Sequence, residues 1–203
     1  MNQGIKTNHR LRCLRSTLEK WITLNRTLGR RWMKYSKDAP WWYNERALLS
    51  VFVGAVWQNG EEAFEEFSEL KRRDRTLSPG RVDLWFSSGR WEFWAEAKHL
   101  EIPITRSRTQ TTRINAMMDH AKKDVRKCAP DGFTRRLALV FCMPYLRPCT
   151  PREMNQRLTW LLEQADDIEH DALAWVFPNL KRLPKAYGWV SPGIIVWIKE
   201  VRR

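Results

Sequence analysis

Two stretches typical of β-strands carry charged residues among apolar and aromatic ones. They form the segment GRVDLWFSSGRWEFWAEAKHL, residues 80–100, with Ser-Ser-Gly-Arg as the predicted turn. Side chains alternate between the two faces of a strand. A tight turn centred on Ser-Gly places Asp83 opposite Trp94, so that Asp83, Glu96 and Lys98 share one face. A three-residue turn would reverse this parity. The opposite face is apolar and comprises Val82, Leu84, Phe86, Phe93, Ala95 and Ala97.

Two carboxylates that meet on one face of a sheet repel each other unless a cation lies between them. Carboxylate oxygens are hard ligands and favour Mg²⁺ or Mn²⁺. Lys98 points to the same side as Glu96, where it is placed to hold a water molecule beside such a metal. This chemistry suits hydrolysis of a phosphodiester, because a metal offsets charge in the transition state and lowers the pKa of bound water. The alternative is an edge hairpin with a solvated face and a Glu–Lys surface pair.

The same residues resemble the signature of the PD-(D/E)XK nuclease superfamily, whose fold is called restriction-endonuclease-like. The family's pattern is D…(D/E)xK. It is matched by Asp83, followed after twelve residues by Glu96-Ala97-Lys98, and Val82 stands where the family often has proline. The compact hairpin is similar to that of the Holliday-junction-resolvase-like branch. The resemblance covers residues 43–145. It implies a central mixed sheet flanked by helices and a Mg²⁺-dependent nuclease, an endonuclease first, that acts on nucleic acid, with DNA ahead of RNA and with Mn²⁺ able to substitute; DNA versus RNA and endonuclease versus exonuclease stay open.

The resemblance also implies roles for single residues. Asp83, Glu96 and the Ala97 carbonyl would bind the metal, and Lys98 would position the attacking water. Glu45, in a predicted helix over 43–57, would bind or orient a metal or its water. From the sequence alone, Glu45 is equally a first-turn acid that stabilises the dipole of its helix beside an Asn44 cap.

The formal net charge of +13 favours an anionic partner, with nucleic acid ahead of an acidic membrane surface. Residues 1–38 hold ten Lys or Arg against two acids. Apolar residues in this segment recur at helical spacing and predict one amphipathic helix over about 9–35. We expect residues 1–38 to form a basic helical arm that docks by its apolar stripe, contacts phosphates, or does both. The candidate phosphate contacts are Arg10, Arg12 and Arg15.

A second cationic stretch, ITRSRTQTTR, follows the hairpin. Its arginines and threonines are suited to phosphate contacts, although a solvated loop explains them equally well. The candidates are Arg106, Arg108 and Arg113, with Arg113 nominated first.

The remaining pattern predicts a mixed α/β domain over residues 39–203. Four cysteines without a CxxC pair favour a reducing, cytoplasmic location. The sequence shows neither an apolar run long enough to span a membrane nor a secretory signal. Besides residues 43–57, helices are predicted over 107–127 and 151–167; strands are predicted over 64–72 (where a helix is the alternative), 81–86, 91–98, 136–143, 172–177 and 193–201.

Two functions besides a nuclease remain open. One is a nucleic-acid-binding protein that keeps the nuclease-like fold without catalysis, and the other is a basic subunit of a larger nucleic-acid-processing assembly. A homodimer also remains open. The complete set of acids with a lysine favours the nuclease, because a protein that only binds an anion gains nothing from acids that face it.

Overall fold

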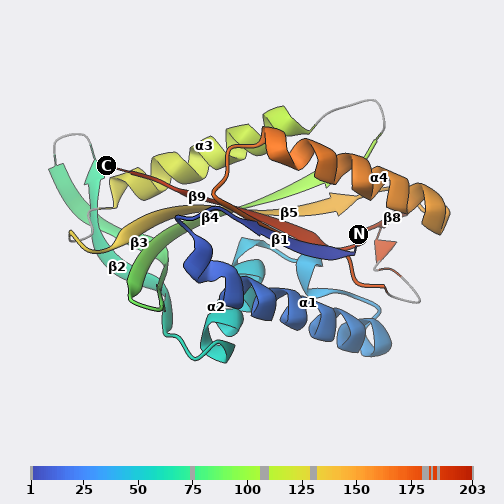
Figure 1. The fold of residues 1–203 in the computed structure, drawn as a ribbon, viewed down its shortest axis with the longest axis horizontal. Helices are drawn as coiled ribbons and strands as arrows, with labels where there is room; N and C mark the ends of the chain where they lie inside the picture. Colours follow the sequence, from blue (N-terminus) through green and yellow to red (C-terminus); the bar gives the residue numbers. More distant parts are fainter. Residues whose placement is uncertain are drawn as a thin grey trace.

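The computed structural model describes residues 2–73, 76–105, 110–128, 132–179, 183, 185–186 and 188–202. Its centre is a seven-stranded mixed sheet with the order β1-β6-β9-β5-β4-β3-β2 (Figure 1). β4 and β5 pair in parallel, and the other neighbouring strands of this sheet pair antiparallel. The predicted α/β class, a mixed sheet flanked by helices, is therefore confirmed.

The sheet has short strands at one edge, β1 and β6, and a long strand, β2, at the other; a separate two-stranded pair, β7–β8, comes between β6 and β9 in the sequence. The strands are β1 (Gln3–Thr7), β2 (Ala63–Arg73), β3 (Thr76–Ser88), β4 (Trp91–Pro103), β5 (Arg135–Tyr145), β6 (Ala172–Val176), β7 (Lys185–Ala186), β8 (Trp189–Val190) and β9 (Ile194–Glu200). The helices are α1 (Arg15–Tyr35), α2 (Glu45–Gln58), α3 (Thr111–Lys127) and α4 (Pro151–Glu163), with short 3-10 helices η1 (Arg12–Leu14), η2 (Pro40–Trp42) and η3 (Gln164–Asp167).

Helices cover both faces of the sheet: α1 and α2 lie on one side, and α3 and α4 on the other (Figure 1). Each side has its own hydrophobic cluster. The apolar run of β5 contributes to both, since Leu139 belongs to the α1–α2 cluster and Val140 to the α3–α4 cluster. A strand buried on both faces needs such a continuous apolar run. None of the described helices is both long and apolar enough to cross a membrane.

The N-terminal segment differs from the predicted arm. Its helix begins at Arg15 rather than near residue 9, and it is preceded by the strand β1, which pairs with β6 at the sheet edge. α1 buries Leu18, Trp21 and Ile22 in the α1–α2 cluster. Residues 2–38 thus share the sheet and core of the rest of the chain. The five-residue segment Gln-Gly-Ile-Lys-Thr has one large apolar side chain, which is too little for an alternating pattern to stand out.

The turn of the β3–β4 hairpin also lies one residue further along than predicted. Ser88 pairs with Trp91 and Trp85 with Trp94, so the turn residues are Gly89 and Arg90. Gly89 has a φ of 60°, which a two-residue hairpin turn needs and which glycine adopts without strain. The register moves by two residues, so the predicted parity is retained for the residues that pair across the hairpin, from Leu84 with Ala95 to Ser88 with Trp91.

Packing of α1 into the core generates a stability prediction. Trp21 is fully buried, whereas Trp57 at the end of α2 is 53% exposed. We expect Trp21→Ala to lower the free energy of unfolding by ~3–5 kcal/mol through the cavity that it leaves. Trp57→Ala should cost less than about 0.5 kcal/mol. Urea denaturation of both variants measures this, and a Trp21→Ala protein as stable as the wild type would mean that α1 does not belong to the core.

Candidate active site

The candidate site lies where β3 separates from β4. The paired ladder between these strands ends at Leu84 and Ala95. Beyond that point two carboxylates bind backbone N–H groups on the edge of β4: the Ala97 N–H donates to Asp83 Oδ2 at 2.8 Å, and the His99 N–H donates to Glu45 Oε2 at 3.0 Å. Buried backbone donors need a partner, so these two acids take the place of the departing strand.

An irregularity in β2 and β3 turns Asp83 into this gap. The ladder between the two strands runs from Glu65–Leu84 directly to Phe67–Val82 and omits the pair in between. Glu66, in the omitted pair, has a φ of 50°, an uncommon conformation for a residue other than glycine. As a result Val82 packs in the α3–α4 cluster and Leu84 in the α1–α2 cluster. The predicted common apolar face is therefore wrong at Val82, because the alternation breaks at Asp83.

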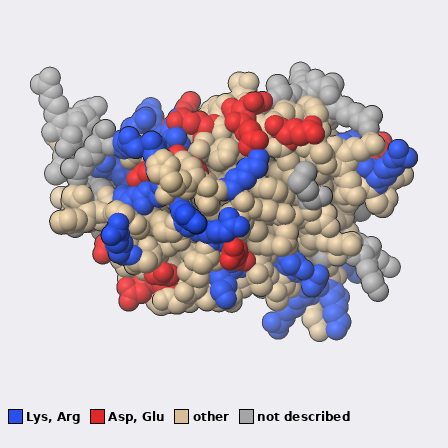
Figure 2. All heavy atoms as spheres, viewed as in Figure 1, with Lys and Arg blue, Asp and Glu red and all other residues tan. Residues whose placement is uncertain are grey.

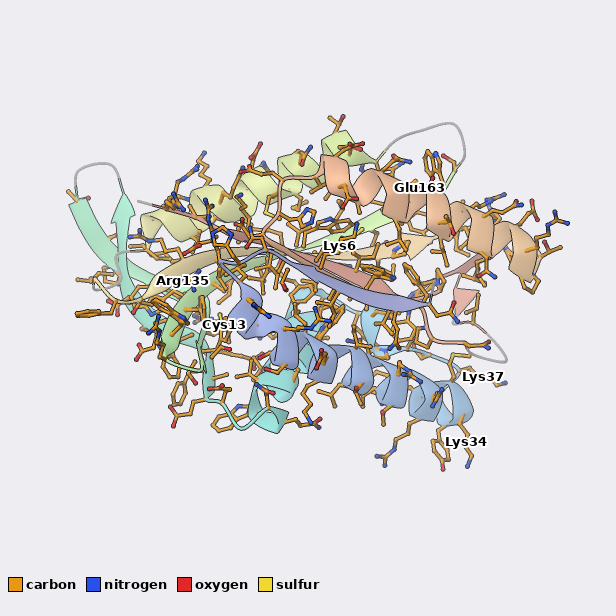
Figure 3. The ribbon with its side chains drawn as sticks, in the orientation of Figure 1. Lys6, Cys13, Lys34, Lys37, Arg135 and Glu163 are labelled. Carbon is orange, nitrogen blue, oxygen red and sulfur yellow. The ribbon has the colours of Figure 1, made fainter. Side chains whose placement is uncertain are left out.

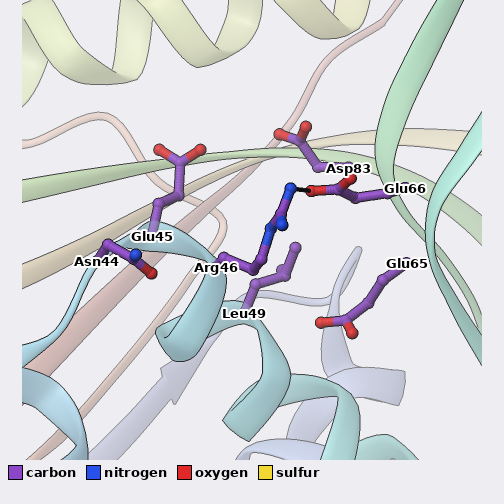
Figure 4. Close-up of a pocket in the computed structure, with 7 residues that line it drawn as sticks. All are labelled: Asn44, Glu45, Arg46, Leu49, Glu65, Glu66 and Asp83. Carbon is purple, nitrogen blue, oxygen red and sulfur yellow. Dashed lines mark hydrogen bonds and ion pairs between the residues drawn. The ribbon is translucent and has the colours of Figure 1, made fainter.

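A cavity of about 510 Å³ adjoins the gap, between the start of α2 and the β2–β3 ribbon (Figure 4). The carboxylates of Glu45 and Asp83 project toward the same side of it. Glu66 binds Arg46 from α2 and, at 2.5 Å, Arg81 from β3. The lining residues are Asn44, Glu45, Arg46, Leu49, Glu65, Glu66 and Asp83.

Local sequence explains why Glu45 lies here. The Asn44 side chain caps α2 by accepting the Ala47 N–H, so the predicted cap is confirmed. The cap fixes the first turn of α2, and Glu45 in that turn reaches across to β4. Burial is the main reason that the pKa of Glu45 is raised, and the charge of Asp83 adds to it while that of Lys98 opposes it.

Glu96 lies deeper, on the side of the sheet that α3 covers. It is 3% exposed. Its Oε1 atom is 2.5 Å from Lys71 Nζ of β2 and 3.6 Å from the Cys128 thiol. Burial, and next the charge of Asp83, raise the pKa of Glu96. Asp83 and Glu96 therefore influence each other electrostatically, but a lysine that the sequence did not nominate holds Glu96.

Lys98 lies among acids from three elements. Its Nζ donates to the Ala97 carbonyl at 2.9 Å and lies 3.2 Å from Asp124 of α3. Burial alone would lower the pKa of Lys98, but the charges of Glu45 and Asp83 and the contact with Asp124 hold it above its ordinary value. Lys98 is therefore a fixed ammonium at neutral pH.

Sequence reasoning missed Asp124 as well as Lys71. A signal for Asp124 exists, because it follows the buried Ala121 by three residues and so lies on the side of α3 that faces the sheet. Among the described residues, ion pairs hold Glu96 and Asp124, but none holds Asp83 or Glu45. Within the described residues Asp83, Glu45 and also Glu65, which accepts from the Ser50 hydroxyl, line the cavity without an ion pair, in a protein whose net charge is +13.

The oxygen atoms gathered here fit a hard divalent cation by their chemistry. Asp83 and Glu45 present carboxylates to the cavity, whereas one lysine holds an oxygen of Glu96 and another holds the Ala97 carbonyl. Across the part of the chain that the structure describes, no three His, Cys, Asp or Glu side chains are close enough together to hold a metal ion. These ligands would therefore have to draw together around a cation, with Glu96 exchanging its lysine.

Four of the arginines predicted to bind nucleic acid, Arg10, Arg12, Arg15 and Arg113, do not line this cavity. Arg113 is exposed and donates to the Glu101 carbonyl at 3.1 Å. Arg10 is half-buried, and its guanidinium lies 3.9 Å from Asp171. Arg12 and Arg15 are exposed near the start of α1, where Arg15 is 3.3 Å from Glu19. The remaining two candidates, Arg106 and Arg108, lie outside the described residues.

Comparisons of the chain with protein-family models, with curated proteins and with solved structures find no match. The resemblance to the PD-(D/E)XK nucleases consequently rests on the motif and on the arrangement of these side chains.

The two motif acids should respond differently to neutralisation. Asp83→Asn keeps an oxygen for the Ala97 N–H and removes a charge that repels Glu45 and Glu96, so the melting temperature without metal should stay the same or rise. Glu96→Gln leaves the Lys71 ammonium, 15% exposed, without its carboxylate and should cost about 3 kcal/mol. Thermal and urea denaturation in EDTA measure both effects. Equal destabilisation by the two substitutions would contradict these assigned environments.

Proposed function

We propose that the protein is a metal-dependent nuclease of restriction-endonuclease-like fold that hydrolyses phosphodiester bonds of DNA. The observation that carries this proposal is the gap between β3 and β4. There Asp83 and Glu45 hold the edge of β4 and face a cavity without paired cations, and Lys98 lies beside them. Such a concentration of acid in a basic protein is costly unless it serves a cation.

Each residue has a role in this proposal. Mg²⁺ would be held by Asp83, Glu96 and the Ala97 carbonyl, with Glu45 as a further ligand or a partner for its water. Bound there, it would supply positive charge that offsets the charge of the transition state and acidifies water. Lys98 would orient the attacking water, because its ammonium already lies among these oxygens. Asp124 would be a positioning residue that holds Lys98 in place.

A second candidate is a nucleic-acid-binding protein that keeps this fold without catalysis. One observation favours it: Lys71 and Lys98 already hold the Glu96 and Ala97 oxygens that a metal would need. In that case the lysines neutralise the site permanently, and Lys98 serves only as an ion-pair partner or a phosphate contact.

Lys98→Ala distinguishes the two candidates. In the nuclease, Lys98 acts mainly in the transition state, so single-turnover cleavage should fall by at least ~100-fold. DNA binding in Ca²⁺ should change little. Lys98→Arg should also be slow, because a planar guanidinium does not replace a compact ammonium. The matched control is Lys122→Ala, which removes a half-buried lysine of α3 that pairs with Asp119 of the same helix and with Glu169 just after η3.

Cleavage by Lys98→Ala at the wild-type rate would remove the catalytic role of Lys98. A binding protein would instead show no cleavage by the wild type, and Lys98→Ala would lower its log–log salt slope by about one.

The surface of α1 supports an anionic partner. Its exposed basic residues are Arg12 just before the helix, Arg15, Lys20, Arg30, Arg31 and Lys34 along it, and Lys37 just after it. Lys and Arg side chains gather over the end of α1 (Figure 2), where Lys34 and Lys37 project outward (Figure 3). Trp32 near this end lies 5.6 Å, ring to ring, from Tyr43, two residues before Glu45. The basic end of α1 is therefore next to the start of α2, the helix that carries a site acid.

Neutralising this end of α1 should weaken DNA binding without unfolding the protein. We expect the triple change Arg30→Gln, Arg31→Gln and Lys34→Gln to lower the log–log salt slope of binding by up to about 3. The control removes the same charge from exposed residues on the other side of the sheet, by Lys123→Gln, Arg126→Gln and Arg152→Gln. Fluorescence anisotropy over a range of salt concentrations measures the slopes. A larger loss in the control would place the polyanion on the α3–α4 side instead.

A further inference from the structure

The contact between Lys71 and Glu96 joins distant parts of the fold. Lys71 belongs to β2, the outermost strand at its edge of the sheet, and Glu96 to β4 near the sheet centre. Their Nζ and Oε1 atoms are 2.5 Å apart, with side chains 15% and 4% exposed. Most ion pairs at a surface contribute little to stability, but a pair this buried leaves an uncompensated charge when either partner is lost.

The surroundings of Lys71 are shaped to admit it. A Cβ atom at Gly80 on the neighbouring strand would lie 2.8 Å from Lys71 Cγ, so the absence of a side chain there leaves room for the lysine stem. An isolated backbone bridge between Lys71 and Cys128 joins β2 to the end of α3. The Cys128 thiol, whose pKa is raised by burial to about 12, stays protonated and donates to the same Glu96 oxygen.

Asp83 and Glu45, the other two acids proposed to bind the metal, have no such arrangement. Within the described ranges Asp83 and Glu45 bind backbone N–H groups and lack a lysine or arginine partner, whereas Glu96 has Lys71 inserted against it from a separate strand. A lysine ammonium satisfies a buried carboxylate in the same way as a metal ion does, by placing positive charge on its oxygen. The two cations cannot occupy that oxygen together.

We propose that Lys71 is an internal counter-ion of Glu96 that competes with a divalent cation for this carboxylate. Without metal, Lys71 keeps the buried acid satisfied; a cation that takes Glu96 as a ligand must displace Lys71 from Oε1 or share the charge of the carboxylate with it, and either lowers the affinity for the metal. This inference rests on the proposed function, since it takes Glu96 as a metal ligand. It adds a residue from β2 that sets the affinity of the site for metal.

Binding of Mn²⁺ to the full-length protein, measured by isothermal titration calorimetry, tests the competition. Lys71→Met removes the charge and keeps an unbranched side chain, and it should bind Mn²⁺ at least 10-fold more tightly than the wild type. In EDTA the same variant should melt at a lower temperature, because Glu96 has lost its partner, and Mn²⁺ should raise its melting temperature by more than it raises that of the wild type. Lys122→Met is the matched control, because Lys122 is 14% exposed and its ion pairs lie outside the site; its affinity for Mn²⁺ should be unchanged.

A second variant covers the case in which Lys71→Met does not fold. Lys71→Gln still donates a hydrogen bond to Glu96 but carries no charge, so it should also bind Mn²⁺ more tightly than the wild type. Equal or weaker binding in the Lys71 variants, with clear binding by the wild type, would overturn the competition and leave the proposed function standing. Binding by a Lys71 variant alone would support the competition. Absence of Mn²⁺ binding in every protein would overturn the metal-dependent function and this inference with it.

Discussion

The candidate site depends on two carboxylates that replace a strand. Where β3 leaves β4, Asp83 and Glu45 accept the N–H groups of Ala97 and His99. Without these acceptors the edge of β4 would carry unpaired buried donors, and the strands would gain by closing on each other. The same two bonds hold the gap open beside the cavity and fix α2 against the sheet. The N–H groups of β4 need acceptors, and meeting that need also fixes the positions of the two acids.

That feature concentrates negative charge in a basic protein. Burial and the charge of Asp83 raise the pKa of both Glu45 and Glu96, so ionising these acids in the folded protein is costly. The chain offsets part of this cost with ammonium groups, Lys98 near the gap and Lys71 on the α3 side. An arrangement that served stability alone would use fewer acids. Asp83 and Glu45 lack a direct ion pair within the described residues, and this is the feature on which the proposed cation site rests.

Sequence reasoning succeeded where the information is local. The Asn44 cap, the apolar run of β5 and the hairpin around Gly89 each depend on neighbouring residues, and they place Asp83, Glu96, Lys98 and Glu45 on the right elements. It failed where distant segments meet. The left-handed conformation of Glu66, which breaks the alternation at Asp83, has no signal in a glutamate, and the contacts of Lys71 and Asp124 form only when β2 and α3 pack against the hairpin. β1 was missed because its pairing partner lies about 170 residues away.

Cleavage of DNA by the purified protein decides whether the acids at the β3–β4 gap serve a metal-dependent nuclease. Supercoiled plasmid and single-stranded DNA are incubated with wild-type protein in Mg²⁺ and in EDTA, and Asp83→Asn protein purified in the same way reports any contaminating nuclease. We expect cleavage by the wild type in Mg²⁺, none in EDTA and none by Asp83→Asn. Intact DNA in every reaction, or equal cleavage by the wild type and by Asp83→Asn, would contradict the proposed function.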